Sequence, residues 1–401
     1  MAGVVLGVCT IYSVCCSLKL AMNNSNSVQD CRNCPDGSGK LGNDVEKNGA
    51  QGETNKETQL GRKLVEFIKR QNEEKREFKL CRGILNPSLD CFMISSIQCF
   101  LQLFEFCRNF YMNGDDGCVG KDEDIKYPSE NISDKCKISK ELKRIIDCYY
   151  LEDKKFSLEQ FRPLYDKEFP RSSQHDALQF ILSLFENIQS EINGDKAHFP
   201  SSGYKDCKEA WEQYQKTHTS AIDKLFVGMY ESIFKCEECS KEVKVYEEFK
   251  TISLYCNQSD PEASFKEFLE HPESTEFSQM MCHDCESIQK CQISKKIVKY
   301  PKYMILAFQR LDPIIQTKIN GRMHYEEEFT RQCPLVEKDL KYKINSVIIH
   351  RGEINYGHYT AICKRGSEWV YFNDSHFKEV AEIINDDAYI LFYETDDIDV
   401  M

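Results

Sequence analysis

The sequence predicts an α+β fold, because helical patterns come first along the chain and strand patterns fill its last third. The helical patterns are two amphipathic segments that begin near residues 90 and 173. The strand patterns are short segments rich in β-branched and aromatic residues. Since helices and strands do not alternate one by one, their order does not fit a parallel sheet built of βαβ units.

The composition argues against a nucleic-acid partner and indicates a reducing compartment. The chain has 401 residues, 41% of them hydrophobic, and a net charge of -13. It can therefore bury a full core, but it lacks the basic balance that nucleic-acid binding needs. An acidic protein of this kind suits a basic protein substrate. Its 21 cysteines are scattered through apolar positions such as Cys99, Cys107 and Cys363, so we expect reduced thiols and a cytoplasmic or nuclear location.

Residues 1–76 are expected to lie apart from the globular part of the chain. They begin with an apolar run, "AGVVLGVCTIYSVCC", which is short for a membrane span and lacks the basic start of a signal peptide. The run is either an unstructured start or a membrane anchor. If it is an anchor, Lys19 on its C-terminal side keeps the rest of the chain in the cytosol. A polar linker over residues 22–60 and a charged helix follow.

The first amphipathic helix is predicted to begin after Asp90, a good N-cap residue. Cys91 then occupies the first helical position, where the helix dipole favours a negative charge and hence a thiolate. A cysteine at a helix start is otherwise usually a core thiol, so Cys91 needs a base to count as a nucleophile. The predicted core side chains of this helix are Met93, Ile97, Phe100, Leu101 and Phe104.

The second amphipathic helix is predicted within "SSQHDALQFILSLFENI". Ser173, with Asp176 three residues later, resembles a capping box. Residues 112–137 and 193–222 are polar and charged, so we expect them to form surface loops. The predicted core positions of the helix repeat at helical spacing: Ala177, Phe180, Ile181, Leu184, Phe185 and Ile188.

Two CxxC pairs, Cys236-x-x-Cys239 and Cys282-x-x-Cys285, have the spacing of a four-cysteine zinc site. Each pair can direct two thiolates at one ion, and strand-like segments flank both pairs. A finger built from hairpins would therefore bring them together. Unligated thiols and disulfides are the alternatives. A closed site of this kind has no open coordination position, so we expect a structural zinc ion and no catalytic cofactor.

The last third is predicted to contain the strands "MILAFQRL", "INSVIIH", "HYTAICK", "EWVYF" and "AYILFY". A two-residue turn at Arg365–Gly366 would pair the third with the fourth and place His358 opposite Asn373. Asn373 could then orient the imidazole of His358, with Asp374 as the adjacent alternative. His350 and His376 are other candidates for the base.

Four segments in this order resemble the ubiquitin-specific proteases, a family of papain-like cysteine peptidases. "GILNPSLDCFMISSIQCF" is similar to the family's cysteine box and "SSQHDALQFILSLF" to its second box. The two CxxC pairs with their flanking strands resemble its zinc finger, and "GHYTAICKRGSEWVYFNDSHFKEV" resembles its histidine box. The resemblance implies a catalytic domain at residues 77–398, with a helical thumb, a β palm and zinc-bearing β fingers at about residues 225–300.

The same resemblance implies a deubiquitinating thiol protease, which hydrolyses isopeptide or peptide bonds at the C-terminal glycine of ubiquitin. Cys91 matches the nucleophile and Asn86 the asparagine of the oxyanion hole. His358 matches the base, Asn373 its orienting partner and Asp374 the neighbour of that partner. Ubiquitin and ubiquitinated proteins would be the partners, and a membrane would be one only if the N-terminal run is an anchor.

The chain departs from the family pattern immediately before the cysteine. Residues 87–90, Pro-Ser-Leu-Asp, replace a Gly-containing loop that ends in Thr. The carboxylate of Asp90 opposes a thiolate on Cys91 unless it is occupied in capping the helix. The altered loop makes a catalytically weak or inactive ubiquitin-binding scaffold one alternative for the function. A peptidase for a ubiquitin-like modifier is a second, separate alternative.

Overall fold

The computed structural model describes residues 81–110, 136–150, 155–194, 198–256, 260, 263–271, 273–312, 317–353, 356–383 and 386–397. The predicted N-terminal run, linker and charged helix lie outside these residues, as does nearly all of the predicted loop at 112–137. Among the described helices, none combines the length and the hydropathy that a membrane crossing requires.

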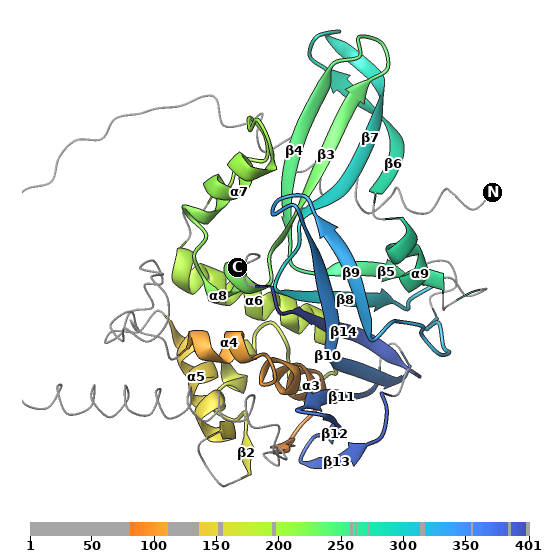
Figure 1. Ribbon diagram of the computed structural model, residues 1–401. Coiled ribbons are helices and arrows are strands. Elements are labelled where there is room, and N and C mark those ends of the chain that lie inside the picture. Colours follow the sequence, from red (N-terminus) through yellow and green to blue (C-terminus); the bar gives the residue numbers. More distant parts are fainter. Residues whose placement is uncertain are drawn as a thin grey trace, which may run out of the picture. The chain divides into compact units, whose positions relative to one another are not determined.

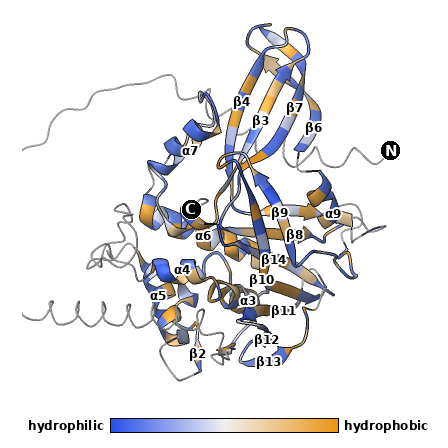
Figure 2. Cartoon of the chain, in the orientation of Figure 1, coloured by the Kyte–Doolittle hydropathy of each residue, from blue (hydrophilic) through white to orange (hydrophobic). Residues whose placement is uncertain are grey.

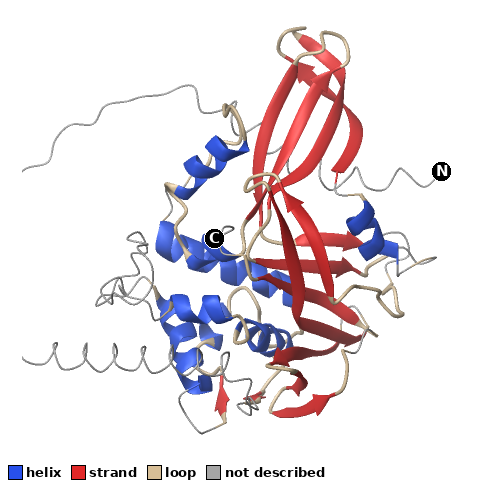
Figure 3. Ribbon diagram, viewed as in Figure 1, coloured by secondary structure: helices blue, strands red, loops and turns tan. Residues whose placement is uncertain are grey.

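Among the described residues the helices precede most of the strands, as predicted, and the first described helix is completely buried. The helix α3 has ten residues, all buried, and it packs against α6 and β11. Figure 3 shows the helical and strand regions of the chain. The helices are α3 (Cys91–Phe100), α4 (Phe104–Asn109), α5 (Lys137–Tyr150), the 3₁₀ helix η1 (Arg162–Tyr165), α6 (Ala177–Asn193), α7 (Cys207–Gln215), α8 (Ala221–Leu225) and α9 (Ala263–Glu270).

The helical predictions were correct in their core positions except for Phe104, wrong at two helix boundaries, and wrong in one predicted loop. The predicted core of α6 is buried throughout, but the helix begins after Asp176, whose side chain accepts a hydrogen bond from the Gln179 backbone, and not after Ser173. The helix α3 ends at Phe100, so Phe104 starts α4 and is only half-buried. The predicted loop at 193–222 contains α7 and α8, because Trp211 and Tyr214 supply an apolar face that packs beside Val227.

One sheet separates two apolar cores. Its strand order is β13-β12-β11-β10-β14-β8-β5, and β9 pairs with β10 beside this path. Along β8, Tyr303, Ile305 and Ala307 face the core that contains α3 and α6, whereas Met304 and Leu306 face the core that contains α9. The strands are β5 (Ile252–Tyr255), β8 (Tyr303–Gln309), β9 (Glu328–Cys333), β10 (Lys338–Gly352), β11 (Gly357–Arg365), β12 (Glu368–Asn373), β13 (His376–Val380) and β14 (Ala388–Thr395).

The five predicted strands are confirmed as β8, β10, β11, β12 and β14, but the predicted hairpin register is wrong by two residues. Arg365 pairs with Glu368 and Ala361 with Phe372, so the turn lies at Gly366–Ser367. Gly366 has a φ of 60°, a left-handed conformation that glycine adopts without strain. Because a shift of two residues leaves every side chain on its original face, His358 and Asn373 still share a face.

A second sheet of four strands, ordered β4-β3-β7-β6, projects away from the first (Figure 1). Hydrophobic and hydrophilic residues alternate along its strands (Figure 2). One CxxC pair begins at the end of β3 and the other at the end of β6. Its strands are β3 (Gly228–Cys236), β4 (Glu242–Phe249), β6 (Glu273–Cys282) and β7 (Ser287–Lys299); a separate two-stranded pairing joins β1 (Ile84–Leu85) to β2 (Phe156–Ser157).

Candidate active site and metal centre

Cys91 occupies the first position of α3, as predicted, and is 3% exposed. The backbone N–H groups of this first turn give the helix end a partial positive charge, which favours a thiolate there. Asp90 is the N-cap residue, but its side chain forms no capping hydrogen bond. Instead its carboxylate accepts a hydrogen bond from Ser88 and pairs with Arg162. The prediction that the helix start lies between Asp90 and Cys91 is confirmed, whereas the capping role of Asp90 is wrong.

His358 lies at the start of β11 and faces Cys91 across the contact between α3 and β11. Its Nε2 lies 2.7 Å from Oδ1 of Asn373, at the end of β12. Since an amide oxygen is an acceptor, Nε2 donates, and the other ring nitrogen remains for Cys91. A hydrogen bond with the Cys91 side chain raises the pKa of His358 to about 9, assisted by Asn373 and by the charge of Asp374 and opposed by burial. These contacts all favour an imidazolium ring.

The two other candidate histidines lie in different surroundings. The ring of His350 stacks on Tyr359 at 4.4 Å between centroids. Burial, together with the positive charge of Lys318, lowers the pKa of His350 to about 4, so it stays neutral. His376 is exposed in β13, where its Nδ1 meets the Ser375 hydroxyl at 3.3 Å. The structure therefore places one histidine, His358, against Cys91.

Asp374 follows Asn373 in the turn that joins β12 to β13. It has a φ of 50°, and its backbone oxygen accepts a hydrogen bond from the backbone of Ile84 at 3.0 Å. A Cβ added to Gly83 would lie 2.2 Å from the Ser375 carbonyl oxygen, so the glycine allows this close approach. The carboxylate contributes charge to the site, while Asn373 makes the direct hydrogen bond to His358.

Asn86 lies in the loop before α3, where its Oδ1 accepts hydrogen bonds from the backbone N–H groups of Ser88 at 3.3 Å and Asp90 at 3.2 Å. This is an Asx-type turn, which fixes the amide plane of Asn86. With its oxygen so engaged, the side-chain NH₂ group of Asn86 can serve another acceptor.

Gln174 and Asp176, two residues of the second box, hold the strand of His358, a role that was not predicted for either. Gln174 Nε2 donates to the Gly357 carbonyl at 2.8 Å, and the Gly357 N–H donates to Gln174 Oε1 at 2.6 Å. The second oxygen of Asp176 accepts hydrogen bonds from Tyr359 and Tyr389. The only signal in the sequence that could have identified Gln174 was its position two residues before the N-cap residue Asp176. This pattern is too common to indicate a functional residue without further evidence.

The four cysteines of the two CxxC pairs meet at one end of the four-stranded sheet. The Sγ atoms of Cys236, Cys239, Cys282 and Cys285 all lie within 4.8 Å of one another. The distance is 3.9 Å from Cys236 to Cys285 and 3.6 Å from Cys239 to Cys282. Four sulfurs around a tetrahedral zinc ion, at about 2.3 Å each, are about 3.8 Å apart, so this donor set fits such an ion. The predicted clustering is confirmed.

Sequence comparisons relate most of the chain to one enzyme family. The family model described as ubiquitin carboxyl-terminal hydrolase matches residues 82–393. The chain is 26% identical over 366 residues to ubiquitin carboxyl-terminal hydrolase 4 of Saccharomyces cerevisiae, which covers 78% of this chain and 39% of that protein. It is 25% identical over 337 residues to ubiquitin carboxyl-terminal hydrolase Usp2 of Drosophila melanogaster, with 79% and 35% covered. The chain thus spans little more than a third of the length of these relatives.

Solved structures show the same fold. The SAGA DUB module bound to monoubiquitin matches with a TM-score of 0.61 and 20% identity, over 80% of this chain and 70% of that chain. A yeast SAGA DUBm structure with a mutant Sgf73 matches with a TM-score of 0.59 and 22% identity, over 80% and 69%. The predicted α+β fold is therefore confirmed by structure as well as by sequence.

Proposed function

Because the chain belongs to the ubiquitin carboxyl-terminal hydrolase family, we propose that it is a deubiquitinating thiol protease that cleaves isopeptide or peptide bonds at the C-terminal glycine of ubiquitin. One observation carries the proposal: the imidazole of His358 is hydrogen-bonded to Asn373 and lies close enough to Cys91 for the thiol to raise the pKa of the ring. This is the arrangement of a nucleophile, a base and an orienting amide. Ubiquitin and ubiquitinated proteins are the proposed partners.

In the proposed reaction the thiolate of Cys91 attacks the carbonyl carbon of the terminal glycine. The imidazolium of His358 then gives its proton to the departing lysine amine, which leaves a thioester on Cys91. A water molecule, deprotonated by His358, attacks the thioester and releases the ubiquitin carboxylate and the thiol. Asn373 accepts a hydrogen bond from His358 throughout, which keeps the ring in one orientation.

Turnover of full-length ubiquitin bearing a C-terminal fluorogenic amide tests this function, with Cys91→Ala as the inactive control. A ubiquitin probe with a C-terminal electrophile should label wild type and leave Cys91→Ala unlabelled. Binding of ubiquitin without labelling would contradict the proposal and indicate a scaffold. If the corresponding probe made from a ubiquitin-like modifier labels the protein in preference to the ubiquitin probe, ubiquitin is not the substrate.

We expect the alkaline limb of kcat/KM to fall near pH 9, because the leaving amine needs the proton of His358, whose pKa is raised to about 9. In Asn373→Ala this limb should move to lower pH, since the variant loses a hydrogen bond that favours the imidazolium. A profile of kcat/KM from about pH 6 to 10 measures both. An alkaline limb that is unchanged in Asn373→Ala would contradict the assignment of Asn373.

We propose that the Asn86 side chain donates a hydrogen bond to the oxyanion that forms on the glycine carbonyl. In Asn86→Asp the side chain still accepts from Ser88 and Asp90, so the turn persists while the donor is lost. We expect kcat to fall about 10²- to 10³-fold with little change in KM. Steady-state kinetics with the fluorogenic substrate measure this, and a change confined to KM would refute the role.

For the four-cysteine cluster we propose one structural zinc ion, held by Cys236, Cys239, Cys282 and Cys285. The ion would tie the β3–β4 turn to the β6–β7 turn, and with four sulfur ligands it would leave no position for substrate. From the cysteine content of the sequence we propose a reducing compartment, where such a site keeps its thiolates.

A further inference from the structure

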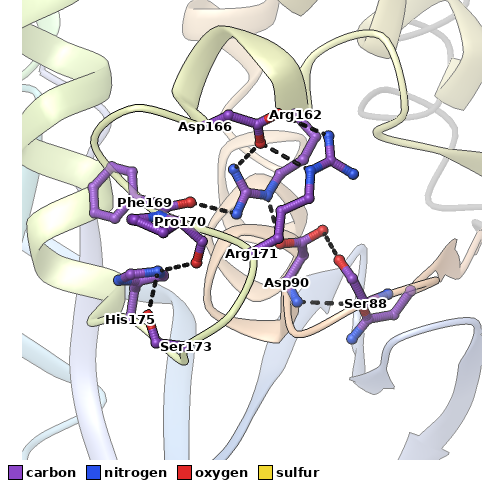
Figure 4. A network of polar contacts seen from close by, with 10 residues as sticks. Ser88, Asp90, Arg162, Asp166, Phe169, Pro170, Arg171, Ser173 and His175 are labelled. Carbon is purple, nitrogen blue, oxygen red and sulfur yellow. Dashed lines mark hydrogen bonds and ion pairs between the residues drawn. The ribbon is translucent and has the colours of Figure 1, made fainter.

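Arg162 is a buried arginine that joins two separate loops. Its side chain is 2% exposed, and each of its three nitrogens has an acceptor. Nε lies 2.6 Å from Asp90 Oδ1, Nη1 lies 2.9 Å from Asp166 Oδ1, and Nη2 lies 2.6 Å from the Phe169 carbonyl oxygen (Figure 4). A guanidinium so fully engaged is rigid, because each hydrogen bond restricts the others.

On one side the network of Arg162 reaches the loop that precedes the nucleophile. Asp90, which is paired with Arg162, accepts a second hydrogen bond from the Ser88 hydroxyl at 2.6 Å. Its backbone N–H donates to Asn86. The guanidinium therefore holds the residue next to Cys91 and, through the Asx turn, the amide proposed for the oxyanion.

On the other side the network reaches the loop that leads to Gln174. The Phe169 carbonyl fixes the beginning of this loop, and the His175 ring lies 2.8 Å from the Pro170 carbonyl oxygen through Nε2. The rings of Phe169 and His175 also pack on Phe92, which follows Cys91, at centroid distances of 5.6 and 5.4 Å. Gln174 brackets the backbone of Gly357, the residue before His358.

We propose that Arg162 is a positioning residue, which aligns the loop of Cys91 with the loop that holds the strand of His358 and neutralises Asp90 beside the nucleophile. This inference rests on the proposed function in one respect: the reaction that the aligned loops would support is the proposed cleavage of ubiquitin. Asp90, at the position where the cysteine box that this chain resembles ends in Thr, is a buried carboxylate. A buried carboxylate needs a paired cation, and Arg162 supplies it.

Loss of Arg162 has a specific electrostatic consequence. In Arg162→Met the carboxylate of Asp90, 4% exposed, would be left unpaired next to Cys91 and would oppose the thiolate. His358 and Tyr359 of β11 interact with Cys91, and Asp374 after β12 and Asp176 before α6 in turn interact with these two residues. These groups are unchanged in Arg162→Met. A displaced pH profile of Cys91 alkylation in that variant would therefore report on the unpaired carboxylate of Asp90.

The test combines ubiquitin turnover with alkylation of Cys91 by iodoacetamide in the full chain, quantified by mass spectrometry of the Cys91 peptide as a function of pH. For Arg162→Met we expect kcat to fall about 10²-fold with KM little changed, because a misplaced catalytic pair affects the chemical step. The alkylation profile should move to higher pH by about one unit. In Arg162→Met/Asp90→Asn the profile should return toward wild type while kcat stays low.

Two further variants keep the test decisive. Arg162→Lys retains the positive charge but loses the forked set of N–H donors, so its alkylation profile should match wild type while its kcat falls. If Arg162→Met does not fold, Arg162→Lys serves as the test variant in its place. Arg171→Met is the matched control, because Arg171 pairs with the same Asp166 but is 46% exposed. Its kcat should stay within about twofold of wild type.

Opposite results overturn the inference. A folded Arg162→Met with wild-type kcat and an unmoved Cys91 alkylation profile would show that the pair is only structural. A displaced profile in a protein whose wild type cleaves no ubiquitin would support the effect of Arg162 on Cys91 and refute the proposed function instead.

Discussion

Replacing His358 with alanine should lower kcat for fluorogenic ubiquitin by about 10⁴-fold, with the protein still folded. The thiol of Cys91 loses the group that stabilises its thiolate, and the leaving amine loses its proton donor. Because the ring is half-exposed and only its Asn373 and Cys91 contacts are specific, its removal should cost little stability. Steady-state kinetics and a thermal melt measure the two effects.

His376→Ala is the matched control for this variant. His376 pairs in register with Asn373 across β12 and β13, yet its ring is exposed and contacts Ser375. Its activity should remain close to wild type. Comparable losses in His376→Ala and His358→Ala would contradict the assignment of the base, and so would a His358→Ala protein that keeps its turnover.

If the four cysteines hold the proposed zinc ion, removing it should unfold the four-stranded sheet at the end that carries them. A structural zinc ion contributes about 10–16 kcal/mol of apparent binding free energy, which is at least comparable to a domain's typical net stability of about 5–15 kcal/mol. We expect one zinc ion per chain in the wild-type protein and none in Cys239→Ser. We also expect a lower melting temperature after chelation, with recovery when zinc is restored. A chromogenic zinc assay and a thermal melt measure these outcomes.

Cys291→Ser provides the comparison, because Cys291 pairs with Cys236 across β3 and β7 and is buried, but lies outside the cluster of four. It should retain the ion. A Cys239→Ser protein with one zinc ion and the wild-type melting temperature would mean that the four thiols hold no metal.

The sequence predicted the regular elements well where one physical signal dominated. The apolar spacing of α6 identified its buried face, because burial at every third or fourth residue is a property of the helix itself. The strand β13 was not among the predicted strands, since four of its five residues are exposed and no apolar alternation marks it. The hairpin register depended on where the turn fell, which the pattern of the strands alone does not fix.

At the candidate site, the sequence predicted which residues come together. It did not predict the distant residues that hold them in place. His358 and Asn373 are 15 residues apart in one hairpin, so counting placed them on one face. Arg162 is 72 residues from Asp90 and lies in a 3₁₀ helix of four residues with no periodic signal. Gln174 meets Gly357 across 183 residues. Contacts of this kind follow from tertiary packing, which no local pattern encodes.

The buried pair of Asp90 and Arg162 also limits how this chain can change over evolution. A substitution of Arg162 alone strands the carboxylate of Asp90 in the interior, whereas a substitution of Asp90 alone leaves Arg162 paired with Asp166. The two positions should therefore covary among close descendants of this lineage.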